Sequence, residues 1–147
     1  MNKTTKTAGA GVAALAMVAL SAGAASAEST LIKVGKYGAL SASHNVAFIK
    51  LKLTCSPDTT YAEADLTLTQ VTHGTVQTQD AMVTLTNALE CSGNEEVVFI
   101  PVRRKTGGFA WVKGAARVSD VNFNTEDPGD DNANNHSHLS GRTVYLR

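Results

Sequence analysis

The segment from residue 45 to residue 55 constrains the fold most, because apolar and polar side chains alternate through most of it. One face would carry Ala47, Ile49, Leu51, Leu53 and Cys55, and the other would carry Lys50, Lys52 and Thr54. A β-strand sends successive side chains to opposite faces, so this pattern predicts one face in an apolar core and one face in water. We therefore predict a half-buried strand, with Cys55 pointing into the core.

Similar alternation recurs along the chain, whereas helical periodicity is hard to find after the first residues. Turn signals such as Ser56-Pro57-Asp58, His73-Gly74 and Thr106-Gly107-Gly108 separate these segments. The predicted strands are residues 30–36, 45–55, 62–69, 82–91, 96–104, 109–121 and 142–147. Pro101 lacks an amide donor, which predicts an edge strand or a bulge. About seven short strands are typical of an all-β, antiparallel β-sandwich.

The chain holds two cysteines, Cys55 and Cys91, and we predict that they form one disulfide. An exported domain meets oxidising conditions, in which a pair of cysteines is usually bridged. The two lie 36 residues apart, and both have the parity of core-facing residues. A reactive thiol is the alternative interpretation.

The first 27 residues have the three parts of a secretory signal peptide. Lys3 and Lys6 supply positive charge, an uncharged apolar run follows, and Ala25-Ser26-Ala27 supplies the small residues that the peptidase requires. The apolar run is shorter than the ~20 residues that cross a bilayer, which favours cleavage over an uncleaved anchor. We predict a secreted or cell-surface protein without membrane insertion, with a single domain at residues 28–147.

The predicted domain is close to neutral, which argues against nucleic acid as its partner. Removing Lys3 and Lys6 leaves eleven basic residues against 13 acidic ones. Such a balance provides no overall field for capturing nucleic acid or an anionic membrane. The one basic cluster visible in the sequence is Arg103-Arg104-Lys105, which is typical of a solvated turn.

Residues 126–140 form an acidic, Asn-rich segment that we predict to be a mobile loop, because it has almost no apolar side chains to bury. Asp127, Asp130 and Asp131 could bind calcium weakly, and His136 and His138 could bind a transition metal. The EF-hand spacing is absent, so a solvated loop is favoured. No metal and no cofactor are predicted.

No catalytic motif stands out. Nucleophilic catalysis needs a nucleophile beside a base that a third group orients. No G-x-S-x-G elbow occurs, and His44 and His73 lie outside any recognisable signature. We therefore predict a protein that is not an enzyme, with a small secreted hydrolase or protease inhibitor as the alternative.

The best candidate binding surface consists of Phe109, Trp111, Lys113 and Arg117, which share one face if residues 109–121 form a strand. Aromatic side chains on a sheet can stack on sugars or anchor an interface, and nearby cations can pair with anionic polymers. Tyr37, Tyr61 and Tyr145 could extend this surface. The alternative interpretation is that Trp111, the only tryptophan, covers one end of the core.

The segments VGKYGALS, LTC, LECSGN, GFAWVKGAARVS and VYLR occur in this order along the domain. In this arrangement the chain resembles small secreted immunoglobulin-like domains of Gram-positive bacteria, a group of families of unknown function. The resemblance implies an immunoglobulin-like sandwich and carries over no catalytic residues. The signal peptide, the strand alternation and the absence of a catalytic motif together predict a binding or structural module whose partner is a cell-envelope polymer or an extracellular protein.

Overall fold

A computed structural model describes residues 29–127 and 134–147, and this part of the chain is all-β, without helix. The predicted signal peptide at residues 1–27 lies outside the described residues. Eight strands are present: β1 (Thr30–Leu40), β2 (Val46–Thr54), β3 (Tyr61–Thr72), β4 (Thr75–Thr84), β5 (Glu95–Arg103), β6 (Gly114–Glu126), β7 (Asn134–Leu139) and β8 (Arg142–Leu146).

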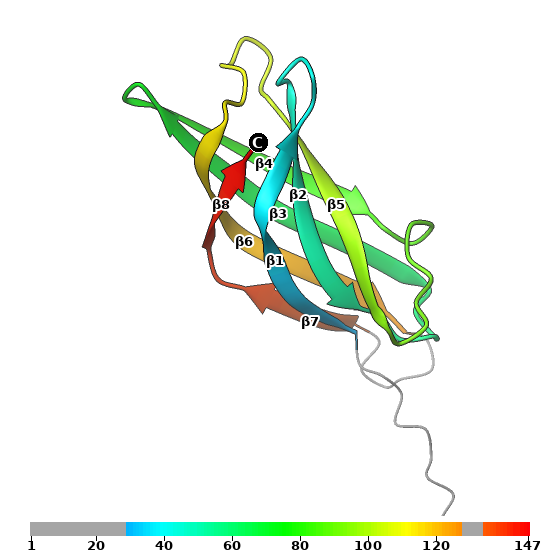
Figure 1. Cartoon of the computed structure of the whole chain (residues 1–147). Coiled ribbons are helices and arrows are strands. Elements are labelled where there is room, and N and C mark those ends of the chain that lie inside the picture. The colour runs from blue at the N-terminus through cyan, green and yellow to red at the C-terminus, as the bar shows by residue number, and fades with distance from the viewer. Residues whose placement is uncertain (1–28, 128–133) are drawn as a thin grey trace, which may run out of the picture.

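The strands form one mixed sheet in the order β4-β3-β6-β8-β1-β2-β5, and β7 also pairs with β6. The sheet curls so that β1, β2 and β5 lie in front of β3, β4 and β6 (Figure 1). The edge strands β4 and β5 approach each other but do not pair, so the sheet stays open. The expected all-antiparallel sheet is wrong in one respect, because β1 and β8 pair in parallel.

Strand β1 gains a second partner half-way along its length. It pairs with β2 through Val34, opposite Leu51, and again from Gly38, opposite Ile49. Three β1 residues between these points face one β2 residue, Lys50, so β1 bulges away from β2 at this position. Beyond the bulge β1 also pairs with β8, where Gly38 lies opposite Leu146.

Two contacts keep the bulge in place. The Arg142 guanidinium on β8 donates a hydrogen bond to the Val34 carbonyl (3.0 Å). At Gly38 the neighbouring strands come so close that an added Cβ would lie 2.9 Å from the Leu146 side chain and 3.0 Å from the Phe48 carbonyl oxygen. Only glycine fits this close approach without a shift of the neighbouring strands.

The core confirms the alternation read from the sequence. All four predicted core-facing side chains of β2 are fully buried, and so is Cys55. On β3 the same holds for Ala62, Ala64, Leu66 and Leu68, each at most 2% exposed. Side chains from β1, β5, β6 and β8 complete the interior. Burial of these alternate side chains is the main favourable contribution to folding.

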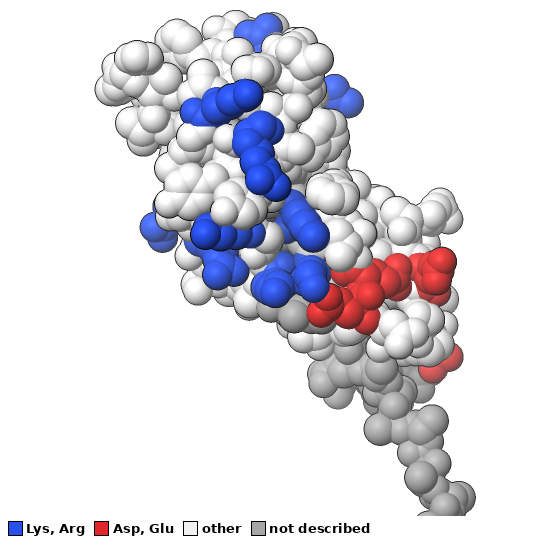
Figure 2. Space-filling view, viewed as in Figure 1, with Lys and Arg blue, Asp and Glu red and all other residues white. Residues whose placement is uncertain are grey.

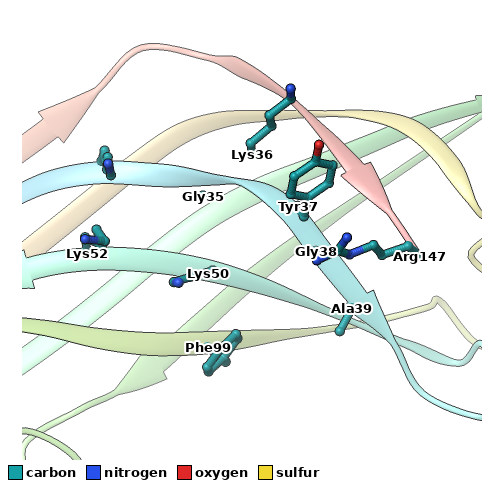
Figure 3. Close-up of a pocket in the computed structure, with 10 residues that line it drawn as sticks. Gly35, Lys36, Tyr37, Gly38, Ala39, Lys50, Lys52, Phe99 and Arg147 are labelled. Atoms are coloured by element: carbon teal, nitrogen blue, oxygen red, sulfur yellow. The ribbon is translucent and has the colours of Figure 1, made fainter.

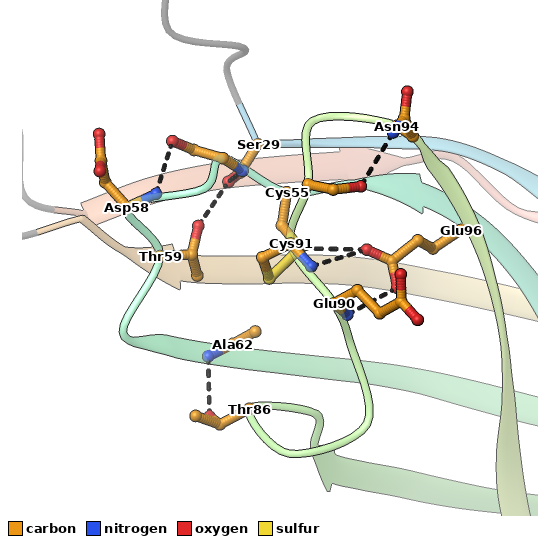
Figure 4. The surroundings of a disulfide bond; sticks show 12 residues. Ser29, Cys55, Asp58, Thr59, Ala62, Thr86, Glu90, Cys91, Asn94 and Glu96 are labelled. Atoms are coloured by element: carbon orange, nitrogen blue, oxygen red, sulfur yellow. Dashed lines mark hydrogen bonds between the residues drawn. A yellow bond between two sulfur atoms is a disulfide. The ribbon is translucent and has the colours of Figure 1, made fainter.

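Cys55 and Cys91 form the predicted disulfide, which joins the end of β2 to the loop before β5 (Figure 4). The Glu96 carboxylate accepts hydrogen bonds from the backbone N–H groups of Cys91 and Glu90, both at 2.9 Å. The Gly93 N–H donates to the Cys55 carbonyl (3.0 Å). The bridge and these bonds attach an irregular loop to the core.

Several smaller predictions are also confirmed. His73 and Gly74 have positive φ angles of 49° and 77°, the conformation that a two-residue hairpin turn requires, and this turn joins β3 to β4. Pro101 lies on β5, an edge strand of the sheet.

The predicted strand at residues 82–91 is wrong for most of its length. β4 begins at Thr75 and ends at Thr84, and a turn follows it. β4 is an edge strand with every second side chain exposed and none buried, so it lacks the apolar alternation that marks a half-buried strand.

The predicted loop at residues 126–140 is wrong at both ends. Glu126 ends β6, and Asn134–Leu139 forms β7, paired with the second half of β6. Backbone pairing and polar cross-strand contacts order β7, so it needs few apolar residues. His136 and His138 lie opposite Asn124 and Asn122, and each imidazole Nδ1 is hydrogen-bonded to the asparagine side chain. Asp130 and Asp131 lie outside the described residues.

We predict that replacing both cysteines with alanine lowers the free energy of unfolding by about 3–4 kcal/mol. The bridge closes a 36-residue loop, and it restricts the unfolded chain more than the folded one. Denaturant titration of both proteins measures the difference. Adding reductant to the unmodified protein should reproduce the loss and leave the double variant unchanged; equal stability of the two proteins would contradict the prediction.

Candidate functional site

The structure does not bring the predicted binding residues together on one face. Trp111 is fully buried, and its indole N–H donates a hydrogen bond to the Val102 carbonyl (3.0 Å). Phe109 is 65% exposed, and Lys113 and Arg117 are exposed as well. The predicted shared surface is therefore wrong, and the alternative interpretation, in which Trp111 covers part of the core, fits its position.

The physical reason is that residues 109–113 are not part of a strand. β6 begins only at Gly114, whose φ of 135° suits glycine. The N–H groups of Trp111 and Val112 donate to the His44 carbonyl (2.9 Å) and the Gln70 side-chain oxygen (3.0 Å). Parity counted from β6 therefore does not extend back to Trp111.

A groove with a volume of about 420 Å³ lies on the outer face of β1 and β2. Its lining comes from β1, β2, β5 and the residue after β8 (Figure 3). The lining residues are Lys33, Gly35, Lys36, Tyr37, Gly38, Ala39, Lys50, Lys52, Phe99 and Arg147. Five of them are cations, and none is acidic.

The groove follows from the same alternation that builds the core. Lys50 and Lys52 point outward because Ile49, Leu51 and Leu53 point inward. Across the β2–β5 pair, Lys50 lies opposite Phe99, whose side chain is 56% exposed. On the other side of β2, Lys33 lies opposite Lys52. Lysines from two strands and one exposed aromatic ring thus share a surface.

At the bulge, Gly35 lets β1 pass directly over Lys50. A Cβ on Gly35 would lie 2.9 Å from the Cβ of Lys50, so a larger residue would push the lysine aside. The bulge also carries Lys36 and Tyr37 on the groove side of β1 (Figure 3).

Tyr37 is the centre of a cluster of cations and aromatic rings. The Arg147 guanidinium lies 4.3 Å from the centre of the Tyr37 ring, and the Lys36 ammonium lies 5.4 Å from it. Both distances are those of cation–π contacts. The Tyr145 ring lies 6.4 Å away from that of Tyr37, and each ring is 45% exposed.

Two backbone hydrogen bonds to β1 hold Arg147 in place. Its N–H donates to the Gly38 carbonyl (3.1 Å), and its own carbonyl accepts from the N–H of Leu40 (3.2 Å). These bonds continue the parallel pairing of β1 with β8 and hold the guanidinium beside the Tyr37 ring. Tyr61 is the first residue of β3 and does not line the groove. Its hydroxyl donates a hydrogen bond to Glu63 on the same strand (2.7 Å).

Acidic side chains lie beyond one end of the groove. Lys and Arg side chains gather in a band over this face, and acidic ones gather beside its lower end (Figure 2). At this boundary Lys52 pairs with Glu95. The hydrogen bond from Lys52 lowers the pKa of the Glu95 carboxyl, as do the charges of Lys52, Lys33 and Lys50, and they outweigh the opposing effect of desolvation.

Sequence reasoning missed this groove because net charge averages over the whole chain. The predicted domain is close to neutral, yet five of its eleven basic residues line one groove. Lys33, Lys36, Lys50 and Lys52 were visible on neighbouring predicted strands. What the sequence did not show is which strands are adjacent, and that Arg147 returns to β1.

Within residues 29–127 and 134–147, no three His, Cys, Asp or Glu side chains are grouped so that they could hold a metal ion. The same residues include no helix with the length and apolar character required to cross a bilayer. Comparison with known proteins gives no match to a protein-family model, a curated protein or a solved structure.

Replacing Trp111 with alanine should lower the free energy of unfolding by about 3–5 kcal/mol, because it removes a large buried side chain and leaves the Val102 carbonyl without its donor. Phe109→Ala is the matched control and should change stability by no more than about 0.5 kcal/mol, since its ring is exposed. Chemical denaturation measures both. Equal effects of the two substitutions would contradict the buried position of Trp111.

Lys52→Gln should raise the pKa of the Glu95 carboxyl toward its ordinary value, because it removes the hydrogen bond that contributes most to the lowered value. Since the folded-state pKa is lowered, the pair stabilises the fold above the unfolded-state pKa, and this contribution is lost as the pH falls through the folded-state value. NMR titration of the Glu95 side chain measures the change. Lys113→Gln should leave that titration as it is; an unchanged titration in Lys52→Gln would refute the assignment.

Proposed function

We propose that this chain is an exported, non-enzymatic binding module with an immunoglobulin-like fold, and that its groove binds a multiply charged anion. The observation that carries the proposal is the set of five cations lining one groove of a nearly neutral domain, with no acidic side chain among the lining residues. Like charges held together repel one another; Glu95 compensates Lys52 at the edge of the groove, and a bound anion would compensate the other cations.

The strand order supports the immunoglobulin-like part of the proposal. β1, β2 and β5 correspond in order to strands A, B and E of an immunoglobulin domain, and β4, β3, β6 and β8 correspond to C′, C, F and G. Two features differ from antibody domains. The disulfide joins β2 to the loop before β5 rather than to β6, and the buried tryptophan precedes β6 rather than lying on β3.

Export is supported by the signal-peptide pattern of residues 1–27 and by the disulfide, which is consistent with an extracellular location. An exported binding module meets the polymers of the cell envelope and the proteins of the medium. A cation-lined groove is suited to the anionic members of both classes.

The chemistry of the groove supports binding rather than turnover. The side chains of its described lining residues offer ammonium and guanidinium groups, a phenol and a phenyl ring, and none of these side chains carries a carboxylate, imidazole or thiol. Ammonium groups act as point charges that attract phosphate and other anions from several directions. Phe99 adds apolar area beside Lys50, against which the uncharged part of a ligand can pack.

Lys50→Gln should weaken the binding of inorganic triphosphate several-fold, because Lys50 lies at the centre of the groove between Gly35 and Phe99. Isothermal titration calorimetry at low salt measures the affinity, which should fall as salt is added. Lys113→Gln removes one positive charge outside the groove and serves as the matched control. Equal loss in both variants would mean that net charge, not the groove, attracts the anion.

A further inference from the structure

The cations of the groove are spread along it rather than gathered round one point. Lys33 and Lys52 lie opposite each other at one end, and Lys36 and Arg147 lie beside Tyr37 at the other. Along β2 the two ends correspond to Lys52 and to Ile49, the partner of Gly38. Three residues at ~3.3 Å each separate them by about 10 Å. Along the backbone, the two ends therefore lie further apart than one phosphate extends.

Most of the cations are of a kind that commonly binds phosphate. Four of the five are lysines, whose ammonium groups impose no planar geometry and bind tetrahedral phosphate as point charges. The planar guanidinium of Arg147, which suits paired bonds to a carboxylate or a phosphate, already lies against the Tyr37 ring at 4.3 Å. The groove therefore offers spaced point charges.

The aromatic side chains argue against recognition of nucleic acid by base stacking. Proteins that bind single strands stack successive bases on exposed aromatic rings. Here the Tyr37 ring is in contact with two cations and a tilted Tyr145 ring. Phe99 is the one other aromatic ring among the described lining residues. The groove thus lacks a row of rings for successive bases.

We propose that the natural ligand of the groove is a linear phosphodiester polymer without bases, such as a chain of polyol or sugar phosphates, that lies along β1 and β2. This inference rests on the proposed function and adds the chemical class of the ligand. Consecutive phosphates of one chain would reach first the Lys33–Lys52 end and then the Lys36–Arg147 end. Once the first phosphate is bound, the next is held near its own cations at a high effective concentration.

The experiment titrates the purified protein with glycerol phosphate oligomers of increasing length, beginning with the single unit. Affinity should rise roughly tenfold or more as the oligomer lengthens and should then level off once the chain spans the groove. A single unit that binds as tightly as long oligomers would overturn the polymer inference and leave the anion-binding groove intact. Failure of every phosphate-bearing probe, triphosphate included, would overturn both.

Two variants test whether both ends of the groove take part. Lys33→Gln and Lys36→Gln each remove one exposed cation from opposite ends, and each should reduce the gain in affinity with length. The Lys113→Gln variant should retain the full gain in affinity with oligomer length. Circular dichroism verifies that all three variants are folded. Equal length dependence in all of them would overturn the proposed path of the chain.

A second pair of probes separates this polymer from nucleic acid. An abasic oligodeoxynucleotide and a thymidine oligonucleotide of equal length carry the same phosphodiester backbone. Equal affinity for both supports recognition of the backbone charge. Markedly tighter binding of the thymidine oligonucleotide would show that bases stack in the groove, and it would overturn the proposal of a polymer without bases.

Discussion

The pairing of β1 with two different partners is the constraint on which the rest of the structure depends. The strand runs antiparallel to β2 on both sides of the bulge at residues 35–37, and from Tyr37 it also pairs in parallel with β8. It thereby connects β2 and β5 to β3, β4 and β6, and the apolar faces of both groups enclose one interior. Without the β1–β8 pair, each of these two strands would be a free edge and the sheet would divide into two.

The groove lies on the outer face of the strands that β1 connects. The bulge presents Lys36 and Tyr37 to the groove, and Gly35 lets β1 lie close against Lys50. Backbone bonds from Arg147 to Gly38 and Leu40 then bring a second cation to the Tyr37 ring. The bulge in β1 therefore contributes both to the strand pairing that encloses the core and to the grouping of cations in the groove.

Sequence patterns predicted the elements whose two faces differ. β2 and β3 bury one face and expose the other, so their apolar alternation was visible, and the inward direction of Cys55 followed from it. β4 and β7 were not predicted as they are. Both lie at margins of the sheet and have few buried side chains, so their pairing depends on backbone hydrogen bonds that leave no apolar pattern.

The site was harder to predict than the fold, for two physical reasons. Parity holds only while the backbone stays extended, and the chain before Gly114 does not, so Trp111 turns inward. The cations that matter come from β1, β2 and the residue after β8, which are far apart in the sequence. Neither the alternation of side chains along a strand nor the total charge of the chain shows that β1 and β8 are adjacent. The groove depends on that adjacency.

The boundary at Lys52 and Glu95 gives one face of the molecule an electric polarity. On the face shown in Figure 2, positive side chains lie on one side of this boundary and negative ones on the other, although the totals for the domain nearly cancel. An external electric field exerts a torque on such a charge distribution even when the net force on the molecule is small. Near a negatively charged surface, attraction of the five groove cations would favour orientations in which β1 and β2 face that surface.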